Sequence, residues 1–225
     1  MGFLNVGSVI ASWLVITTGF CVYFLPESQQ NNRWIISLLF FNNLNLFIAL
    51  CEIVLGYHIK TIQSDYTALR SKYKGNEWDA CVAFLTMPLT ISQCFSGRIW
   101  SKMWSTYALY DPSYQNHESF GFFIDVGNGY STIVPSILMN AAMVFPSYFS
   151  SLWVGCICLA SYWQIMYGTI IYSFSFLFNK RYQGKGLLEI SLFVGVSNGM
   201  WFVFPIIGIW YCVLILRDGD MDIFM

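Results

Sequence analysis

The feature that most constrains this chain is an apolar run over residues 190–216, which is long enough to cross a bilayer as a helix. About 20 apolar residues, at about 1.5 Å each, cover the roughly 30 Å of a hydrocarbon core. This run carries Asn198, Trp201 and Pro205 in its middle. A polar amide at bilayer depth is costly unless it faces a cavity or a partner helix. Asn198 and Trp201 therefore either belong to a functional site or join helices by hydrogen bonding and packing.

The overall composition is typical of a membrane protein. Hydrophobic residues make up 56% of the 225 residues and charged residues only 10%, whereas a soluble domain carries about 25% charged residues. The formal net charge of −1 gives no electrostatic reason to expect nucleic acid as a partner. The seven cysteines lie almost entirely inside apolar runs, so we expect buried hydrophobic side chains and no disulfide or zinc framework. We expect no metal and no cofactor.

Four further apolar runs are long enough to span a bilayer, at residues 6–25, 34–57, 122–144 and 152–178. Together with the run already described, they predict an all-α integral membrane protein. We expect a five-transmembrane-helix bundle with an intramembrane apolar cavity, in one membrane domain over residues 1–225. The first run has no basic region before it and no small-residue cleavage site after it, so we expect a membrane helix and not a signal peptide.

A long connector, residues 59–121, separates the second run from the third and is a candidate lid over the bundle. Inside it, residues 80–95 are apolar but short, and Pro88 interrupts them. A stretch of this length is more typical of a re-entrant, interfacial or covered segment than of a full span. We therefore treat residues 80–95 as a candidate sixth or re-entrant segment.

The second run contains polar residues that a membrane helix rarely carries. Asn45 and Glu52 are seven residues apart and share a helix face, and His58 follows at the end of the run. A glutamate in such a helix is expected to point inward. Apolar surroundings favour its protonated form, which is the form that a proton donor needs. The alternatives are a proton donor and a structural buried acid paired with an asparagine, while His58 is either catalytic or interfacial.

Several separated stretches together resemble the EXPERA family of membrane proteins, and within it the emopamil-binding, sterol Δ8-Δ7 isomerase branch. Residues 198–205 read NGMWFVFP, similar to the N-x-x-W-x-x-x-P run of those isomerases. Residues 164–172 read QIMYGTIIY and residues 104–114 read WSTYALYDPSY, and both are similar to motifs of the family in the same order. Arg33 and Trp34 open the second run as in the plant enzymes.

The resemblance implies an aromatic-lined sterol cavity in which carboxylic acids move a proton on and off a double bond. It assigns Trp201 as the ring that faces the resulting carbocation, with Asn198 as its neighbour, and it matches Asp125 to the acid of the third helix. An electron-rich ring suits that role because its face attracts cations. The resemblance also assigns polar and aromatic positions in the connector and the fourth helix, which are Trp104, Tyr107, Asp111, Tyr114, Gln164 and Tyr172.

The chain departs from the isomerase pattern in its acid–base residues. The isomerases carry His-x-x-x-Glu on the second helix, whereas here the nearest acid is Glu52, two positions along, and the nearest histidine is His58. The motif arginine and glutamate of the connector are replaced by Ser113 and Thr106. A shifted acid with a retained cation-facing wall suggests related chemistry on another substrate.

We therefore expect a membrane-embedded isomerase or cyclase that protonates a sterol-like or terpenoid olefin or epoxide and stabilises the carbocation. The expected catalytic residues are Glu52, Asp125, Trp201 and Asn198. The expected substrate-binding residues are Asn45, His58, Trp104, Tyr107, Asp111, Tyr114, Gln164 and Tyr172. Asp111 precedes a proline and is equally suited to anchoring a lid.

The alternative is a non-catalytic sterol or lipid binder of the sigma-2 receptor type, and a structural or transport role is a third option. Two carboxyls facing one cavity that contains Trp201 favour the enzyme, whereas a carboxyl facing lipid headgroups or water favours the binder. The expected partners are a hydrophobic small molecule, membrane lipids and a second copy of the chain in a homodimer. The expected location is the endoplasmic reticulum membrane.

Overall fold

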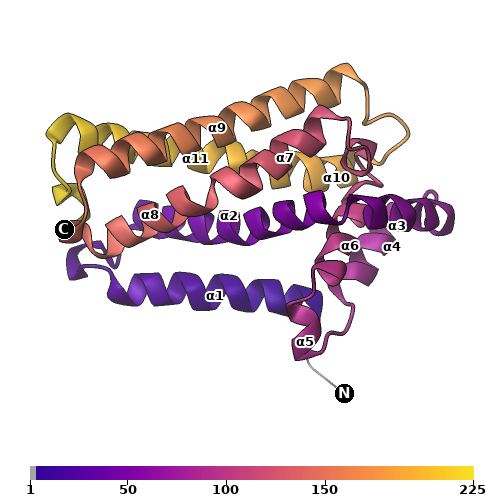
Figure 1. Ribbon diagram of the computed structural model, residues 1–225, viewed down its shortest axis with the longest axis horizontal. Coiled ribbons are helices and arrows are strands. Elements are labelled where there is room, and N and C mark those ends of the chain that lie inside the picture. The colour runs from indigo at the N-terminus through magenta and orange to yellow at the C-terminus, as the bar shows by residue number, and fades with distance from the viewer. Residues whose placement is uncertain (1–3) are drawn as a thin grey trace.

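Four long apolar helices run side by side through the structure (Figure 1). The computed structural model describes residues 4–225, and within that range it contains helices, turns and one isolated bridge but no extended strand. The long helices are α1 (Val6–Phe24), α2 (Arg33–Tyr57), α9 (Ser151–Phe178) and a continuous run, Leu187–Asp218. Among the described residues, these four are the helices long and apolar enough to cross a membrane, which is consistent with an integral membrane protein.

The last long helix is not uniform. It consists of α10 (Leu187–Ile190), a π-helical segment η4 (Ser191–Val196) and α11 (Ser197–Asp218). Insertions of this kind widen a helix locally and are frequent at functional sites. The π-helical segment ends two residues before Asn198.

Side chains and one glycine define the ends of the helices. Asn5 accepts a hydrogen bond from the backbone N–H of Ser8 at 2.9 Å and forms a capping box with it at the start of α1. The Asn32 side chain caps α2 by accepting from the backbone N–H groups of Trp34 and Ile35. The chain leaves α11 at Gly219, whose φ of 77° lies in the left-handed region that glycine adopts without strain.

The segment expected to form one helix over residues 122–144 is divided in two. Helix α7 (Phe120–Ser131) and helix α8 (Ile133–Val144) meet at Thr132 and follow one another along the bundle (Figure 1). Pro135 explains the break, because it has no N–H to donate to the carbonyl four residues earlier and its ring crowds that carbonyl. An uninterrupted helix over this segment was therefore the wrong expectation.

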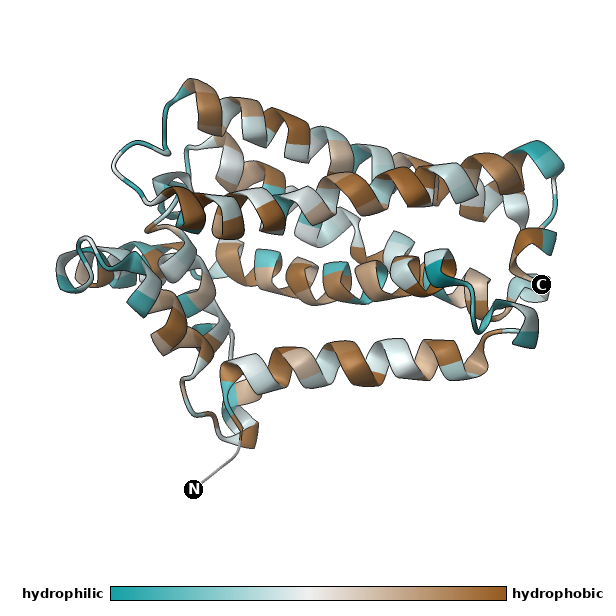
Figure 2. Cartoon of the chain, turned by 180° about the vertical axis from the view of Figure 1, so that it is seen from behind, coloured by the Kyte–Doolittle hydropathy of each residue, from teal (hydrophilic) through white to brown (hydrophobic). Residues whose placement is uncertain are grey.

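The connector over residues 59–121 is largely helical. It contains α3 (Ile59–Lys72), α4 (Glu77–Leu85), α5 (Ile91–Cys94), α6 (Gly97–Tyr107) and the short 3-10 helix η2 (Pro112–Gln115). Three further 3-10 helices lie in other loops, namely η1 (Glu27–Gln29), η3 (Pro146–Tyr148) and η5 (Asp222–Phe224). The connector helices gather at one end of the bundle (Figure 1), and hydrophilic residues are concentrated there and in the loops of the opposite end (Figure 2).

Residues 80–95 do not form a sixth crossing. Helix α4 has nine residues, so it is only about 14 Å long and too short for a bilayer. Backbone hydrogen bonds instead tie the loop around Pro88 to the start of α1. The N–H of Val6 donates to the carbonyl of Met87 at 3.2 Å, and the N–H of Leu89 donates to that of Leu4 at 3.0 Å.

A network of buried amides joins α2 to α8 and α9. The Tyr162 hydroxyl donates to Asn42 Oδ1 at 2.8 Å, and Asn42 Nδ2 donates to Asn140 Oδ1 at 2.9 Å. Asn140 Nδ2 in turn donates to Asn43 Oδ1 at 3.0 Å. Each amide would be costly to bury alone, so these bonds fix how the three helices pack.

Helices α2 and α7 lie close together at Gly129. A Cβ atom at this position would lie 2.9 Å from the carbonyl oxygen of Ala49 and 2.9 Å from Cβ of Glu52. Only a residue without a side chain allows the two backbones to come this near. The contact therefore holds α7 directly against the turn of α2 that carries Glu52.

We predict that Gly129→Ala destabilises the protein by about 1–3 kcal/mol, because the added methyl group overpacks the contact between α2 and α7. Gly127→Ala is the matched control in the same helix, since a Cβ atom there meets nothing within 4 Å. The measurement is unfolding in detergent micelles followed by tryptophan fluorescence. Equal unfolding midpoints for the two variants would contradict the close approach at Gly129.

Candidate functional site

A pocket of about 250 Å³ lies where α2, α6, α7, α9 and α11 converge. All of the residues expected to be catalytic line it, as do the aromatic residues expected to bind substrate. These are Glu52, Asp125, Asn198, Trp201, Trp104, Tyr107, Tyr114 and Tyr172. Residues that are up to 149 positions apart in the chain therefore meet around one space.

The two acids enter the pocket from different helices, Glu52 from α2 and Asp125 from α7. Glu52 is only 5% exposed, and its Oε2 has no hydrogen-bond partner among residues 4–225. Asp125 is less deeply buried. An unpartnered carboxylate in apolar surroundings is costly. The pocket therefore contains two carboxyl groups that come from different helices.

Asn45 holds the indole of Trp201 in place. Trp201 Nε1 donates to Asn45 Oδ1 at 2.9 Å, and Asn45 Nδ2 donates to the hydroxyls of Thr132 and Ser136, each at 3.1 Å. Asn45 is 3% exposed and does not line the pocket. Asn45 therefore contributes to the pocket indirectly. It binds the indole N–H of Trp201, and Trp201 itself lines the pocket.

Asn198 is both a link between helices and part of the pocket wall, so the two interpretations of this residue are compatible. Its Nδ2 donates to the hydroxyl of Tyr107 at 3.0 Å and to the carbonyl of Val194 at 2.8 Å. The Tyr107 hydroxyl also lies 3.4 Å from that of Tyr172. Burial raises the pKa of Tyr107 to about 12, so its hydroxyl keeps its proton at neutral pH.

Aromatic rings form the wall that the connector contributes. Trp104 stacks on Tyr114 with ring centroids 5.3 Å apart and planes inclined by 26°, and Tyr107 meets Tyr114 edge to face at 5.0 Å. Trp104 is fixed by a 2.6 Å hydrogen bond from its Nε1 to the carbonyl of Cys51. Ring faces of this kind attract a positive charge that develops in an apolar space.

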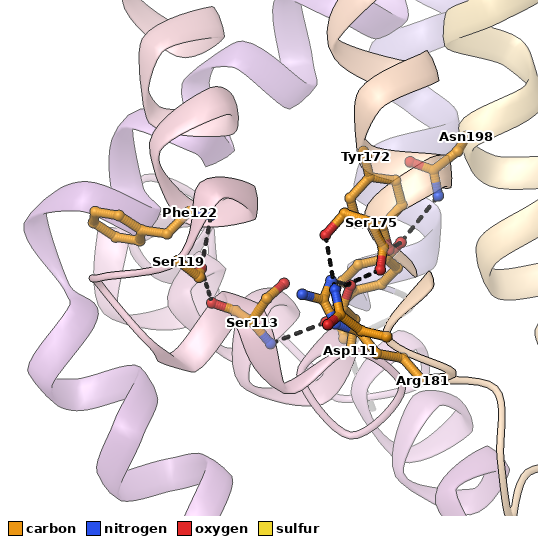
Figure 3. A network of polar contacts seen from close by, with 10 residues as sticks. Asp111, Ser113, Ser119, Phe122, Tyr172, Ser175, Arg181 and Asn198 are labelled. Atoms are coloured by element: carbon orange, nitrogen blue, oxygen red, sulfur yellow. Dashed lines mark hydrogen bonds and ion pairs between the residues drawn. The ribbon is translucent and has the colours of Figure 1, made fainter. Parts of the chain in front are cut away.

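Asp111 does not reach the pocket, contrary to the expectation that it binds substrate. It is fully buried and accepts a 3.1 Å ion-pair contact from Arg181, as well as the backbone N–H of Ser113 at 2.9 Å. Figure 3 shows Arg181 reaching Asp111 close to Tyr172, with Asn198 on the neighbouring helix. The pair ties the connector to the loop that follows α9, which agrees with the alternative of an anchor.

His58 and Gln164 also lie outside the pocket. His58 is at the junction of α2 and α3, where its ring packs against Gly97. Gln164 Nε2 donates to Asn128 Oδ1 at 2.9 Å and to the hydroxyl of Ser131 at 2.6 Å. Gln164 therefore supports a pocket residue and is not one itself.

Sequence reasoning missed several residues that line the pocket. Asn128 lies one helical turn after Asp125 on the same face, and this spacing is a signal that points to it. Thr169 lines the pocket next to Gly168, where α9 comes close to α7. Phe193 belongs to the π-helical segment, and no pattern in the sequence predicts that it lines the pocket.

No family model matches the chain, and comparisons with curated proteins and with solved structures also found no match. Conclusions about function therefore depend on the site itself. Within residues 4–225, no group of three or more histidine, cysteine, aspartate or glutamate side chains is arranged to hold a metal ion.

We predict that the effects of Asn45→Leu and Trp201→Phe on the free energy of unfolding are coupled by about 0.5–1.5 kcal/mol. This is the net contribution of one hydrogen bond to stability. The measurement is a double-mutant cycle on the free energy of unfolding. Asn42→Leu serves as the control partner of Trp201→Phe, because Asn42 bonds to Asn140 and Tyr162 instead. Additive effects for both pairs would show that the indole is not held by Asn45.

We predict that Arg181→Met destabilises the protein by about 3 kcal/mol, because it leaves the buried carboxylate of Asp111 without its charge partner. The control is Arg98→Met, which removes the more exposed ion pair with Asp65. That change is expected to cost less than about 1 kcal/mol. Equal losses in thermal unfolding would contradict the role of Asp111 as an anchor.

Proposed function

We propose that this protein is a membrane-embedded enzyme of the EXPERA type, which protonates a double bond of a sterol-like or terpenoid substrate and stabilises the carbocation. The observation that carries the proposal is that Glu52 and Asp125, from different helices, line one pocket together with Trp201. Two carboxyls beside an electron-rich ring are the groups that proton addition, cation stabilisation and proton removal require.

In the proposed reaction, Glu52 donates its proton to one carbon of the double bond. The π electrons form the new C–H bond, and the neighbouring carbon becomes a cation that faces the ring of Trp201. Asp125 then removes a proton from the next carbon, whose C–H electrons form the shifted double bond. No atom is gained or lost, because Asp125 releases the proton it has accepted to water and Glu52 takes up a proton from water before the next turnover.

The burial of the two acids supports this assignment of roles. Glu52 is the more deeply buried and has the unpartnered oxygen, so it is the better donor, and Asp125 is the better acceptor. An epoxide substrate uses the same groups. Proton transfer from Glu52 opens the epoxide, a nearby olefin closes a ring on the cation, and Asp125 removes the final proton.

The proposal includes a membrane setting for the pocket. Helices α7 and α8 together complete a fifth crossing, so that the pocket lies inside a five-helix bundle in the endoplasmic reticulum membrane and is reached by apolar molecules. Exposed aromatic and aliphatic side chains on α9 and α11, such as Trp163, Phe174 and Trp210, support contact of these helices with lipid.

A second candidate function is binding of a sterol or lipid without catalysis, as in the receptor branch of the family. The position of His58 favours it, because this histidine lies outside the pocket, whereas the isomerases use a histidine on the second helix. In that case the unpartnered Oε2 of Glu52 would accept a hydrogen bond from a hydroxyl or amine of the ligand.

We predict that the wild-type protein changes the sterol or terpenoid profile of a sterol-isomerase-deficient yeast. Glu52→Gln and Asp125→Asn should each lower the amount of product by at least about 100-fold, the usual contribution of a general acid or base. Asp79→Asn, which removes an exposed acid of α4, is the control and should leave the profile as in wild type.

Lipid extracts analysed by mass spectrometry decide between the two candidates. Identical profiles for wild type, both acid variants and the empty vector would exclude the enzyme. Binding of a radiolabelled sterol by purified wild-type protein, lost in Glu52→Gln but without any product, would then support the binder.

A further inference from the structure

A second hollow, of about 540 Å³, opens between α9 and the η4–α11 helix. We call it the lateral groove, and its wall is formed by Ile170, Phe174, Leu177, Val194, Gly195 and Phe202. Thr169 and Asn198 line both this groove and the pocket that contains the acids. The two spaces therefore adjoin at these two residues.

The pocket alone is too small for the substrate class that we propose. Ligand sites usually enclose about 300–1,000 Å³, whereas the pocket has about 250 Å³. The lateral groove adds enough volume to bring the combined site into that range. A polycyclic substrate whose double bond lies among the acids must therefore extend beyond the pocket.

The surface of the lateral groove suits a hydrocarbon. The Ser173 hydroxyl donates to the carbonyl of Thr169 at 2.8 Å, and the Thr169 hydroxyl donates to that of Ile165 at 3.0 Å, so both are turned back to their own helix. The Nδ2 of Asn198 donates to the hydroxyl of Tyr107 and to the carbonyl of Val194. Donors that are already satisfied within the protein do not require hydrogen bonds from a ligand.

The groove also reaches the outer face of the bundle. Phe174 is 66% exposed and Leu177 is 59% exposed, and both belong to α9, which is long and apolar enough to face a bilayer. The groove therefore extends from these exposed side chains to Asn198, which also lines the pocket that contains the acids. An apolar substrate can follow it without passing through water.

We infer that the substrate is elongated, that its reactive double bond lies in the pocket, and that its unreactive hydrocarbon tail occupies the lateral groove between α9 and η4. This inference rests on the proposed function. Thr169 and Asn198 lie at the boundary between the pocket and the lateral groove, and the tail extends from the bundle toward the bilayer. The wall contributed by η4 and α11 selects substrates by the presence and length of this tail.

Glycines keep the lateral groove open. A Cβ atom at Gly199 would meet no atom within 4 Å, and one at Gly195 would have the carbonyl of Ile190 at 3.8 Å as its sole neighbour among the described residues. Gly199 lines the groove, and its surroundings leave room for a larger side chain. Gly19 on α1 has the same open surroundings but is remote from the groove, so Gly19→Leu is a matched control.

The test uses two photoreactive sterols with the wild-type protein in phosphatidylcholine nanodiscs. One carries a diazirine at the end of its alkyl tail and the other carries it in the ring system. We expect the tail probe to label Phe174, Leu177 or Phe202 and the ring probe to label residues of the pocket. Excess unlabelled sterol should remove both labels.

Gly199→Leu should lower tail labelling about tenfold, equivalent to roughly 1.4 kcal/mol of binding, and Gly19→Leu should not.

The labelling does not require turnover, so it separates this inference from the proposed reaction. Competed labelling of the groove without any product would support the inference while the reaction fails. Labelling that excess sterol does not remove would mean that the probe reaches these side chains from the bilayer without occupying a specific site, and it would overturn the inference. Labelling of α1 or α3 in place of α9 and α11 would overturn it equally.

Discussion

The structure depends on the cost of placing polar side chains in apolar surroundings. Helix α2 carries Asn42, Asn43, Asn45 and Glu52, all of them buried. The three asparagines each find partners on neighbouring helices, and these partners determine how α8, α9 and α11 pack around α2. The helices are held in one arrangement because other arrangements leave amides unpaired, whereas apolar contacts alone tolerate rotation of a helix.

Glu52 is the exception on the same helix. Its Oε2 is buried and unpartnered among residues 4–225, although Gly129 brings α7 close enough for a partner to have been provided. Strain or missing partners of this kind are typical of functional sites, since a ligand can satisfy them. The hydrogen bonds that fix Trp201 and Tyr107 leave a pocket beside this carboxyl. The same polar contacts therefore both pack the helices and form the pocket.

Much of this arrangement could be predicted from the sequence, and the rest could not for identifiable reasons. Apolar length predicts the long helices, and the spacing of Asn45 and Glu52 predicts a common face. The break at Thr132 could not be predicted, because the packing around Pro135 determines whether a helix continues through this proline. The bond between Asn45 and Trp201 joins residues 156 positions apart, and no local pattern encodes it. Residue type alone did not distinguish Asp111, an anchor, from Asp125, which lines the pocket.

The most direct test of the central claim is a reaction in deuterium oxide with the purified protein and a Δ8 sterol or an olefinic terpenoid. Proton transfer from Glu52 to carbon predicts one deuterium per product molecule at the newly protonated carbon, because the carboxyl exchanges its proton with the solvent before each turnover. Product that contains no deuterium would contradict the account, since it would mean that no exchangeable acid in the pocket supplies the proton.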